Sequence, residues 1–149
     1  DAGDRRMLVR AARLHEIELA IAHSGYHAHG AYILENSDIA GFSQQGQRFL
    51  AALVRTHRRG IGKSAFEMIP DRLLANARHC AALLRLAVLL HRSHDNQRMP
   101  APQLRADGER LTLTLDKRWL QARPLLRADL DGEPVDMLGL GVQLRLASD

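Results

Sequence analysis

The chain has 149 residues, of which 46% are hydrophobic and 26% are charged, and its formal net charge at pH 7 is +4. This composition is that of a soluble globular protein, and the length allows one domain with a real core or a larger domain with a small appendage. No apolar run reaches membrane-spanning length, because the longest, residues 81–90, is interrupted by Arg85 and predicts a buried helix.

The single cysteine, Cys80, excludes an internal disulfide and is typical of a reducing compartment. It lies among apolar residues, which favours a small buried thiol over a nucleophile. The chain begins DAGDRRMLVRAARL, without an initiator Met and without the layout of a signal peptide. We therefore expect a piece of a longer protein.

Residues 5–22 have apolar side chains at helical spacing and predict a first helix. Gly25 and Gly30 predict a turn, followed by a short apolar run at residues 31–34 and a break with cap-type residues at 35–38.

Ser43 is a plausible N-cap for a helix that continues to His57 and stops before Gly60 and Gly62. Ser64 and Glu67 have the spacing of a capping box and predict another helix start. The most apolar helix runs from Leu73 to His91, and we expect it at the centre of a helical bundle.

A polar segment with two prolines, residues 93–102, is the best candidate linker. Beyond it, residues 109–115 and 141–147 alternate apolar and polar side chains, which predicts half-buried strands. A helix lies between them, broken or bent near Gly132 and Pro134. The predicted fold class is mainly α, with a helical domain at residues 1–92 and a small α/β (strand-helix-strand) domain at 103–149.

Three segments carry a resemblance to a known family: LHEIELAIAHSGYHAHGAYILENSDIAGFSQQGQ, LVRTHRRG and LLRLAVLLHRS. Together they resemble the C-terminal region of the exopolyphosphatase and guanosine pentaphosphate phosphohydrolase (Ppx/GppA) family, over nearly the whole chain. The resemblance implies an HD-like helical domain followed by a small α/β domain. It also implies a bacterial, cytoplasmic parent enzyme, with peripheral membrane association left open.

Full-length members of that family remove terminal phosphate from inorganic polyphosphate or pppGpp with Mg2+, using two actin-like domains that precede this region, and many are dimers. This chain has no Gly-rich phosphate loop and no Asp-rich strand end suited to Mg2+. We therefore expect no catalytic residue and no cofactor here. The expected partners are inorganic polyphosphate, the parent's own N-terminal catalytic domains and a second copy of the chain.

The resemblance also locates a degenerate metal site. His15 and Glu16 occupy the place of the HD family's His-Asp pair, and Val88 occupies the place of its distant Asp. An isopropyl group cannot bind a cation, so we expect no metal in this fragment. One alternative stays open, in which His15, His27, His57 and Glu16 assemble an improvised site.

The stretch HSGYHAH contains His23, His27 and His29. For an arbitrary sequence, one such imidazole would pack inside and the others would lie at the surface. The resemblance instead places this turn at the cleft where polyphosphate enters, where imidazoles can donate to phosphate oxygens. We interpret the three histidines as residues of the substrate path or of an interdomain contact.

A second basic stretch, RTHRRGIGK, lies at the end of the predicted second helix. It is either a solvated, basic helix end or a track for polyphosphate, where several cations would gain from counterion release. Arg85, in contrast, lies within an apolar helix and predicts a structural pairing with a carboxylate, with Glu16 as a candidate. The candidate residues of the track are Arg55, His57, Arg58, Arg59 and Lys63.

Two other functions compete with this interpretation. A self-sufficient HD phosphohydrolase acting on nucleotides would need an Asp at the position of Val88. A basic nucleic-acid-binding module would be expected to have more aromatic residues than the 4% present, and a recognisable motif.

Overall fold

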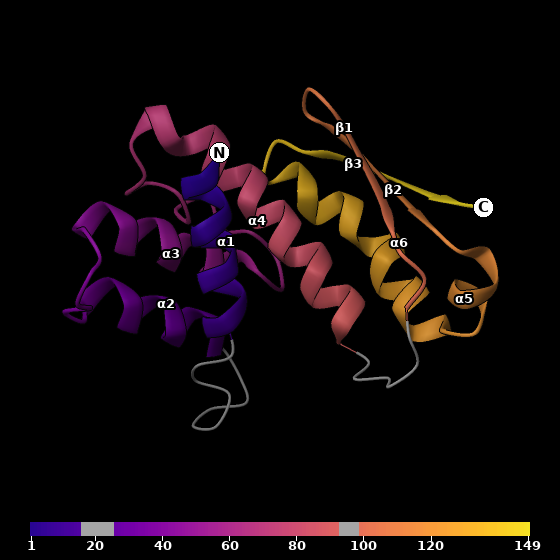
Figure 1. Ribbon diagram of the computed structural model, residues 1–149, viewed down its shortest axis with the longest axis horizontal. Coiled ribbons are helices and arrows are strands. Elements are labelled where there is room, and N and C mark those ends of the chain that lie inside the picture. Colours follow the sequence, from indigo (N-terminus) through magenta and orange to yellow (C-terminus); the bar gives the residue numbers. More distant parts are fainter. Residues whose placement is uncertain (16–25, 93–98) are drawn as a thin grey trace. The chain divides into compact units, whose positions relative to one another are not determined.

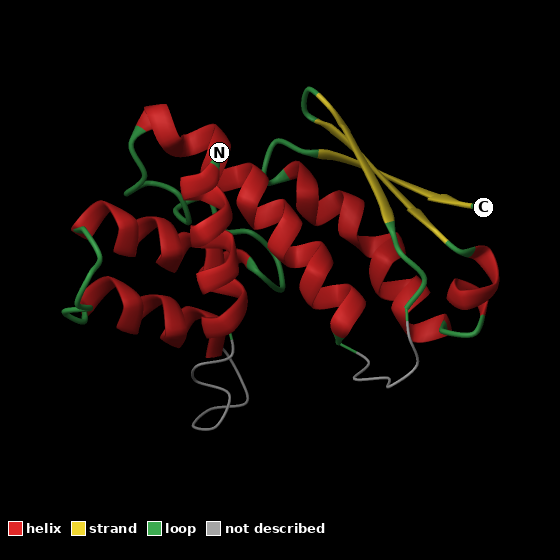
Figure 2. Ribbon diagram, in the orientation of Figure 1, coloured by secondary structure: helices red, strands yellow, loops and turns green. Residues whose placement is uncertain are grey.

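The computed structural model describes residues 1–15, 26–92 and 99–149 (Figure 1). The chain divides into two compact units, Asp1–Arg85 and Leu86–Asp149. Helices make up the first unit, and the second combines helices with a three-stranded sheet (Figure 2). The predicted class, mainly α with a small α/β part, is confirmed at that level.

The first unit contains α1 (Ala2–Leu14), α2 (Tyr26–Asn36), α3 (Gln44–Thr56) and most of α4 (Asp71–His91). The predicted N-cap of α3 is confirmed, because Ser43 Oγ accepts a hydrogen bond from the backbone N–H of Gly46 at 3.1 Å. Helix α3 packs against both α1 and α2. Its buried side chains are Gln47, Phe49, Leu50, Ala51, Ala52, Leu53, Val54 and Thr56.

Two predictions about the helical unit are wrong. Gly30 does not form a turn, because α2 runs through it and buries it, so packing outweighs the roughly 1 kcal/mol that glycine costs a helix. Ser64 and Glu67 do not begin a helix either: residues 63–69 form turns, and α4 begins at Asp71, directly after Pro70. Pro70 explains the difference, because a proline disfavours helical backbone at the residue before it and suits the start of a helix.

Helix α4 confirms the predicted apolar helix. Among the described residues it is the one helix long and apolar enough to cross a membrane by length and composition. Half of its most apolar window is buried within the protein. The core helix of a soluble protein passes the same criterion, so this property is weak evidence for a membrane span.

The second unit contains the last turns of α4, then β1 (Gln103–Asp107), β2 (Arg110–Leu115), α5 (Lys117–Gln121), α6 (Pro124–Leu138) and β3 (Gln143–Ser148). The strand order is β1-β2-β3, with β1 antiparallel and β3 parallel to the central strand. The two predicted strands are confirmed as β2 and β3. Strand β1 and helix α5 were not predicted. Strand β1 is short and exposed along its whole length, and only Leu104 and Ala106 represent the apolar half of its alternation.

A two-residue loop joins β1 to β2, with Gly108 in a left-handed conformation at φ 58°. Helix α6 packs against β3. It is continuous through Gly132 and Pro134, so the predicted break does not occur. The apolar face of α6 explains this, because the contacts of its buried Leu126, Leu130 and Met137 keep the helix in place despite Pro134.

The predicted boundary between the domains lies in a segment of which residues 93–98 are outside the described residues. The two compact units divide earlier in the chain, inside α4 between Arg85 and Leu86. The domain limits of 1–92 and 103–149 therefore stay a prediction.

Candidate functional site

Two histidines meet where α1 and α3 end. His57 follows α3, its side chain is only 2% exposed, and its Nδ1 lies 2.5 Å from the carbonyl oxygen of Val54. His15 follows α1, with its Nδ1 2.7 Å from the carbonyl oxygen of Ala12. Because a carbonyl can only accept, both Nδ1 atoms carry the proton. The rings meet edge to face, with centroids 5.0 Å apart.

Arg85, a residue of α4, donates hydrogen bonds to backbone carbonyls at the end of α3 and just after it. Its side chain is 2% exposed, and Nη1 donates to the carbonyl oxygens of Thr56 and Arg59, each at 2.7 Å. A cation is favourable at this end of a helix, where backbone carbonyls lack partners and the dipole is negative. The predicted pairing of Arg85 with a carboxylate stays a prediction, because its candidate partner Glu16 lies outside the described residues. The predicted structural role of Arg85 fits this geometry.

Arg59 has a left-handed backbone, with φ 63°. This conformation is uncommon for a residue with a side chain and costs on the order of 1 kcal/mol or more, so the surroundings must hold it. The hydrogen bond from buried Arg85 to the Arg59 carbonyl supplies such a restraint. The basic turn that begins at Arg58 is thus fixed by the core beneath it.

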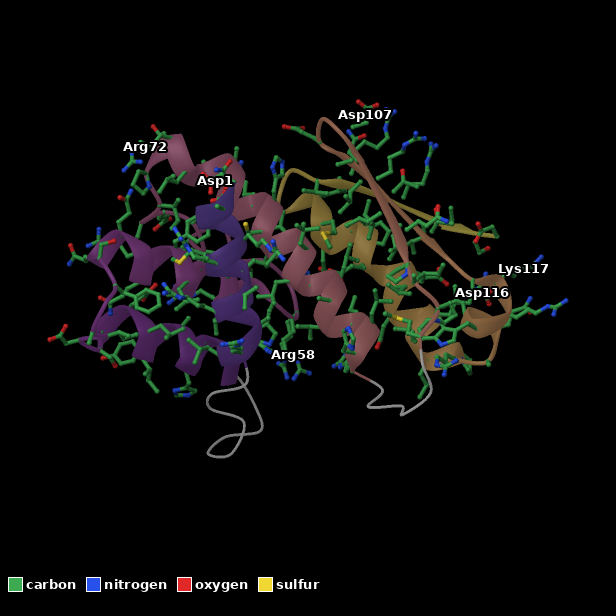
Figure 3. The ribbon with its side chains drawn as sticks, viewed as in Figure 1. Asp1, Arg58, Arg72, Asp107, Asp116 and Lys117 are labelled. Carbon is green, nitrogen blue, oxygen red and sulfur yellow. The ribbon has the colours of Figure 1, made fainter. Side chains whose placement is uncertain are left out.

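The structure separates the predicted track into two groups. Arg55 forms an ion pair with Glu35 of α2 at 3.0 Å, and His57 is enclosed. Arg59 and Lys63 are exposed and Arg58 is half-buried, so these three basic groups follow the surface after α3. Figure 3 shows Arg58 near the edge of this unit.

The other predicted positions are only partly described. His29 is exposed on α2, whereas His23, Glu16 and the side chain of His27 lie outside the described residues. Within residues 1–15, 26–92 and 99–149, no three His, Cys, Asp or Glu side chains are grouped as metal ligands. The degenerate metal site and the donor turn HSGYHAH therefore stay predictions.

Cys80 is buried, as predicted. Burial, and secondarily the negative charge of Asp4, raises the pKa of its thiol to about 11. The thiol is therefore neutral near pH 7, which suits a packing role and not a nucleophile.

One face of the three-stranded sheet was not identified from the sequence. The inward-facing leucines of β2 and β3, such as Leu113 and Leu144, are buried, while the alternate side chains face away from them. We call these alternate side chains the open face. Its members are Gln103, Arg105, Asp107, Arg110, Thr112, Thr114, Gln143, Arg145 and Ala147.

The strand register puts the basic residues of the open face together. Arg105, Thr112 and Arg145 lie directly opposite one another on the three strands, and Arg110 faces Asp107 in the next row. The polar positions of β2 and β3 could be read from their alternation in the sequence. The grouping of the arginines could not be predicted, because it depends on β1, which was not predicted.

The α/β unit also has a small pocket of about 120 Å³. No predicted site residue contributes to it. Its lining residues are Leu115, Leu120, Arg127, Leu130, Asp131, Leu146, Ala147 and Ser148.

Comparisons with known proteins give the chain's relatives. Residues 1–134 match the family described as "Ppx/GppA phosphatase, domain III". A guanosine-5'-triphosphate,3'-diphosphate pyrophosphatase of Pseudoalteromonas translucida is 33% identical over 141 residues, which cover 93% of this chain and 28% of that protein. The enzyme of the same name from Vibrio parahaemolyticus is 32% identical over 145 residues, covering 95% and 28%. The chain thus spans a little over a quarter of the length of these relatives.

Proposed function

The chain belongs to the Ppx/GppA phosphatase family, and from that premise we propose that it is the C-terminal part of a bacterial phosphoric anhydride hydrolase. The parent removes terminal phosphate from inorganic polyphosphate or from guanosine pentaphosphate, as the name of its relatives suggests for the second substrate. Catalysis and Mg2+ belong to actin-like domains outside this chain, and the parent acts in the cytoplasm. The helical unit is a relic of the HD fold.

Within that enzyme, we propose that the helical unit binds and positions a polyphosphate chain and that the region supports dimerisation. The observation that carries the binding proposal is the basic turn after α3. A buried arginine restrains the strained backbone of Arg59, and the restrained turn presents Arg58, Arg59 and Lys63. A turn fixed before binding loses less entropy on contact with an anion, which favours affinity.

Binding of medium-length inorganic polyphosphate to the 149-residue chain, followed by calorimetry over a series of salt concentrations, tests the proposal. Replacing Arg58 by Gln and Arg59 by Asn should weaken binding about tenfold and reduce the salt slope by about two, since each lost phosphate contact removes roughly one released counterion. Asn is chosen because it tolerates the left-handed backbone.

Arg72→Gln is a control, because Arg72 lies in the same unit and far from Arg58 in Figure 3. Its Nη2 donates a hydrogen bond to Gln45 Oε1 at 2.9 Å. This variant should bind nearly as well as the wild type. Unchanged affinity and salt slope in the Arg58/Arg59 variant would overturn the role of the basic turn. Metal-dependent release of phosphate by the purified chain would overturn the assignment of catalysis to other domains.

A further inference from the structure

The arginines of the open face have no internal partners. Arg105, Arg110 and Arg145 are exposed, and none of them makes an ion pair or side-chain hydrogen bond within the part of the chain that the structure describes. The sole acid of the open face, Asp107, lies opposite Arg110 in the register but does not reach it as an ion pair. The face therefore has three unneutralised cations for one carboxylate.

The sheet geometry gives these cations a common centre. Strands about 4.8 Å apart place the Cα atoms of Arg105 and Arg145 roughly 10 Å from each other, with Thr112 between them. Arg110 lies two residues along the central strand from Thr112, roughly 7 Å away. Three flexible guanidinium groups can therefore converge above one threonine hydroxyl, and guanidinium forks suit phosphate oxygens.

Among residues 86–92 and 99–149 of this unit, no helix or strand covers the face. Helix α6 packs on the apolar side, where Leu111, Leu113 and Leu144 are buried (Figure 2). Figure 3 shows Asp107 at the hairpin end of the sheet and Asp116 with Lys117 at its other end. Arg110 lies beside Asp107 at the hairpin end, and Arg105 and Arg145 lie further along the strands, between the two ends.

We propose that the open face is a contact surface for an extended phosphate polyanion without bases, that is, inorganic polyphosphate. This rests on the proposed function for the kind of partner, but it adds a second contact area in a different unit from the turn after α3. The composition of the face distinguishes this partner from nucleic acid. None of its nine side chains is aromatic, so it has no platform for stacking bases, whereas a polyphosphate chain has no bases to stack.

The test measures polyphosphate binding to the 149-residue chain with Arg105 and Arg145 both replaced by Gln. Binding should weaken about tenfold and the salt slope should fall by about two, as expected for two lost phosphate contacts. Asp107→Asn should act in the opposite direction and tighten binding about twofold. A folding defect cannot give that gain, and unchanged far-UV circular dichroism checks the double variant.

The matched control replaces Arg92 and Arg127 by Gln. These arginines belong to the same unit, but they are paired with Asp129 at 3.2 Å and with Asp131 at 3.9 Å. The net charge changes by the same amount, and binding should weaken by less than about twofold, since the face keeps its cations.

Three outcomes would overturn the proposal. The first is equal weakening in both double variants, which would mean that net charge alone matters. The second is full affinity in the Arg105/Arg145 variant. If the Arg58/Arg59 variant still loses affinity in that case, the proposed function stands and only the open face is dismissed. The third is tighter binding to single-stranded poly(U) RNA than to polyphosphate of equal charge.

Discussion

The two units use their arginines in opposite ways. In the helical unit, Arg85 is buried and donates to backbone carbonyls, and Arg55 is paired with Glu35. In the α/β unit, Arg105 and Arg145 are exposed on the open face and have no partner among the described residues. The first group stabilises the fold, and the second remains able to bind an external anion.

The difference shows why an arginine-rich composition says little about ligands. A guanidinium in a helix-rich core meets the carbonyls at helix ends, which are the acceptors that a helix leaves without internal partners. The backbone carbonyls of a sheet lie roughly in its plane, even on an edge strand, whereas the side chains of its polar face stand roughly perpendicular to that plane and point away from these acceptors. The same residue type is therefore structural in one unit and available in the other.

The largest effect should come from exchanging arginine for methionine in each unit. Arg85→Met removes the donor from the buried Thr56 carbonyl and from the partly buried Arg59 carbonyl, so we expect the free energy of unfolding to fall by about 3 kcal/mol. Arg145→Met should change it by less than about 0.5 kcal/mol, because the side chain is exposed and makes no internal bond. Urea unfolding followed by circular dichroism measures both. Equal losses of unfolding free energy in the two variants would contradict the difference in arginine roles between the two units.

Much of this contrast was accessible from the sequence and part was not. The apolar periodicity of α4 and the alternation in β2 and β3 were sufficient to predict these elements, since each buries one face. The buried position of Arg85 could be inferred from its apolar neighbours. The two carbonyls to which it donates could not be inferred, because they lie 26 and 29 residues away in the sequence, at a helix end and in a strained turn.

The candidate site was predicted less completely than the fold. The basic stretch after α3 stood out as a run of charges, but the enclosure of His57 and the pairing of Arg55 depend on tertiary contacts. The open face left no such signal. Arg105 and Arg145 are 40 positions apart in the sequence, and only the strand register brings them to either side of Thr112. This register could not be predicted, because β1 is short and exposed and was not recognised as a strand.

An intermediate effect should come from two glutamines, one in each unit. Gln47 is buried, and its Nε2 donates to the carbonyl oxygens of Leu34, at 3.1 Å, and Ser37, at 2.5 Å, at the end of α2. A carboxylate cannot donate, so Gln47→Glu should lower the free energy of unfolding by about 2 kcal/mol at pH 7. Gln143→Glu, on the open face, should have almost no effect on stability.

The pH dependence provides a second check on Gln47→Glu. Two carbonyls and burial disfavour the charged carboxylate, so its pKa in the folded state should rise above its unfolded value. The unfolded state then loses its proton first as pH rises, which makes the defect largest at neutral pH and smaller in acid. The protonated side chain can also donate one hydrogen bond. A defect that grows on acidification, relative to wild type, would contradict this explanation.

The smallest effect concerns the release of a paired arginine. The ion pair between Arg55 and Glu35 is partly exposed, at 34% and 29%, so solvent screens it, and Glu35→Gln should cost only about 0.5 kcal/mol of unfolding free energy. The variant leaves Arg55 available near the basic turn, so polyphosphate affinity should rise by up to about twofold. Asp107→Asn removes the same charge from the open face and should raise affinity without any loss of stability. If Glu35→Gln lowers stability but leaves affinity unchanged, Arg55 serves the fold alone, and the helical unit's contact with the anion is confined to the residues after α3.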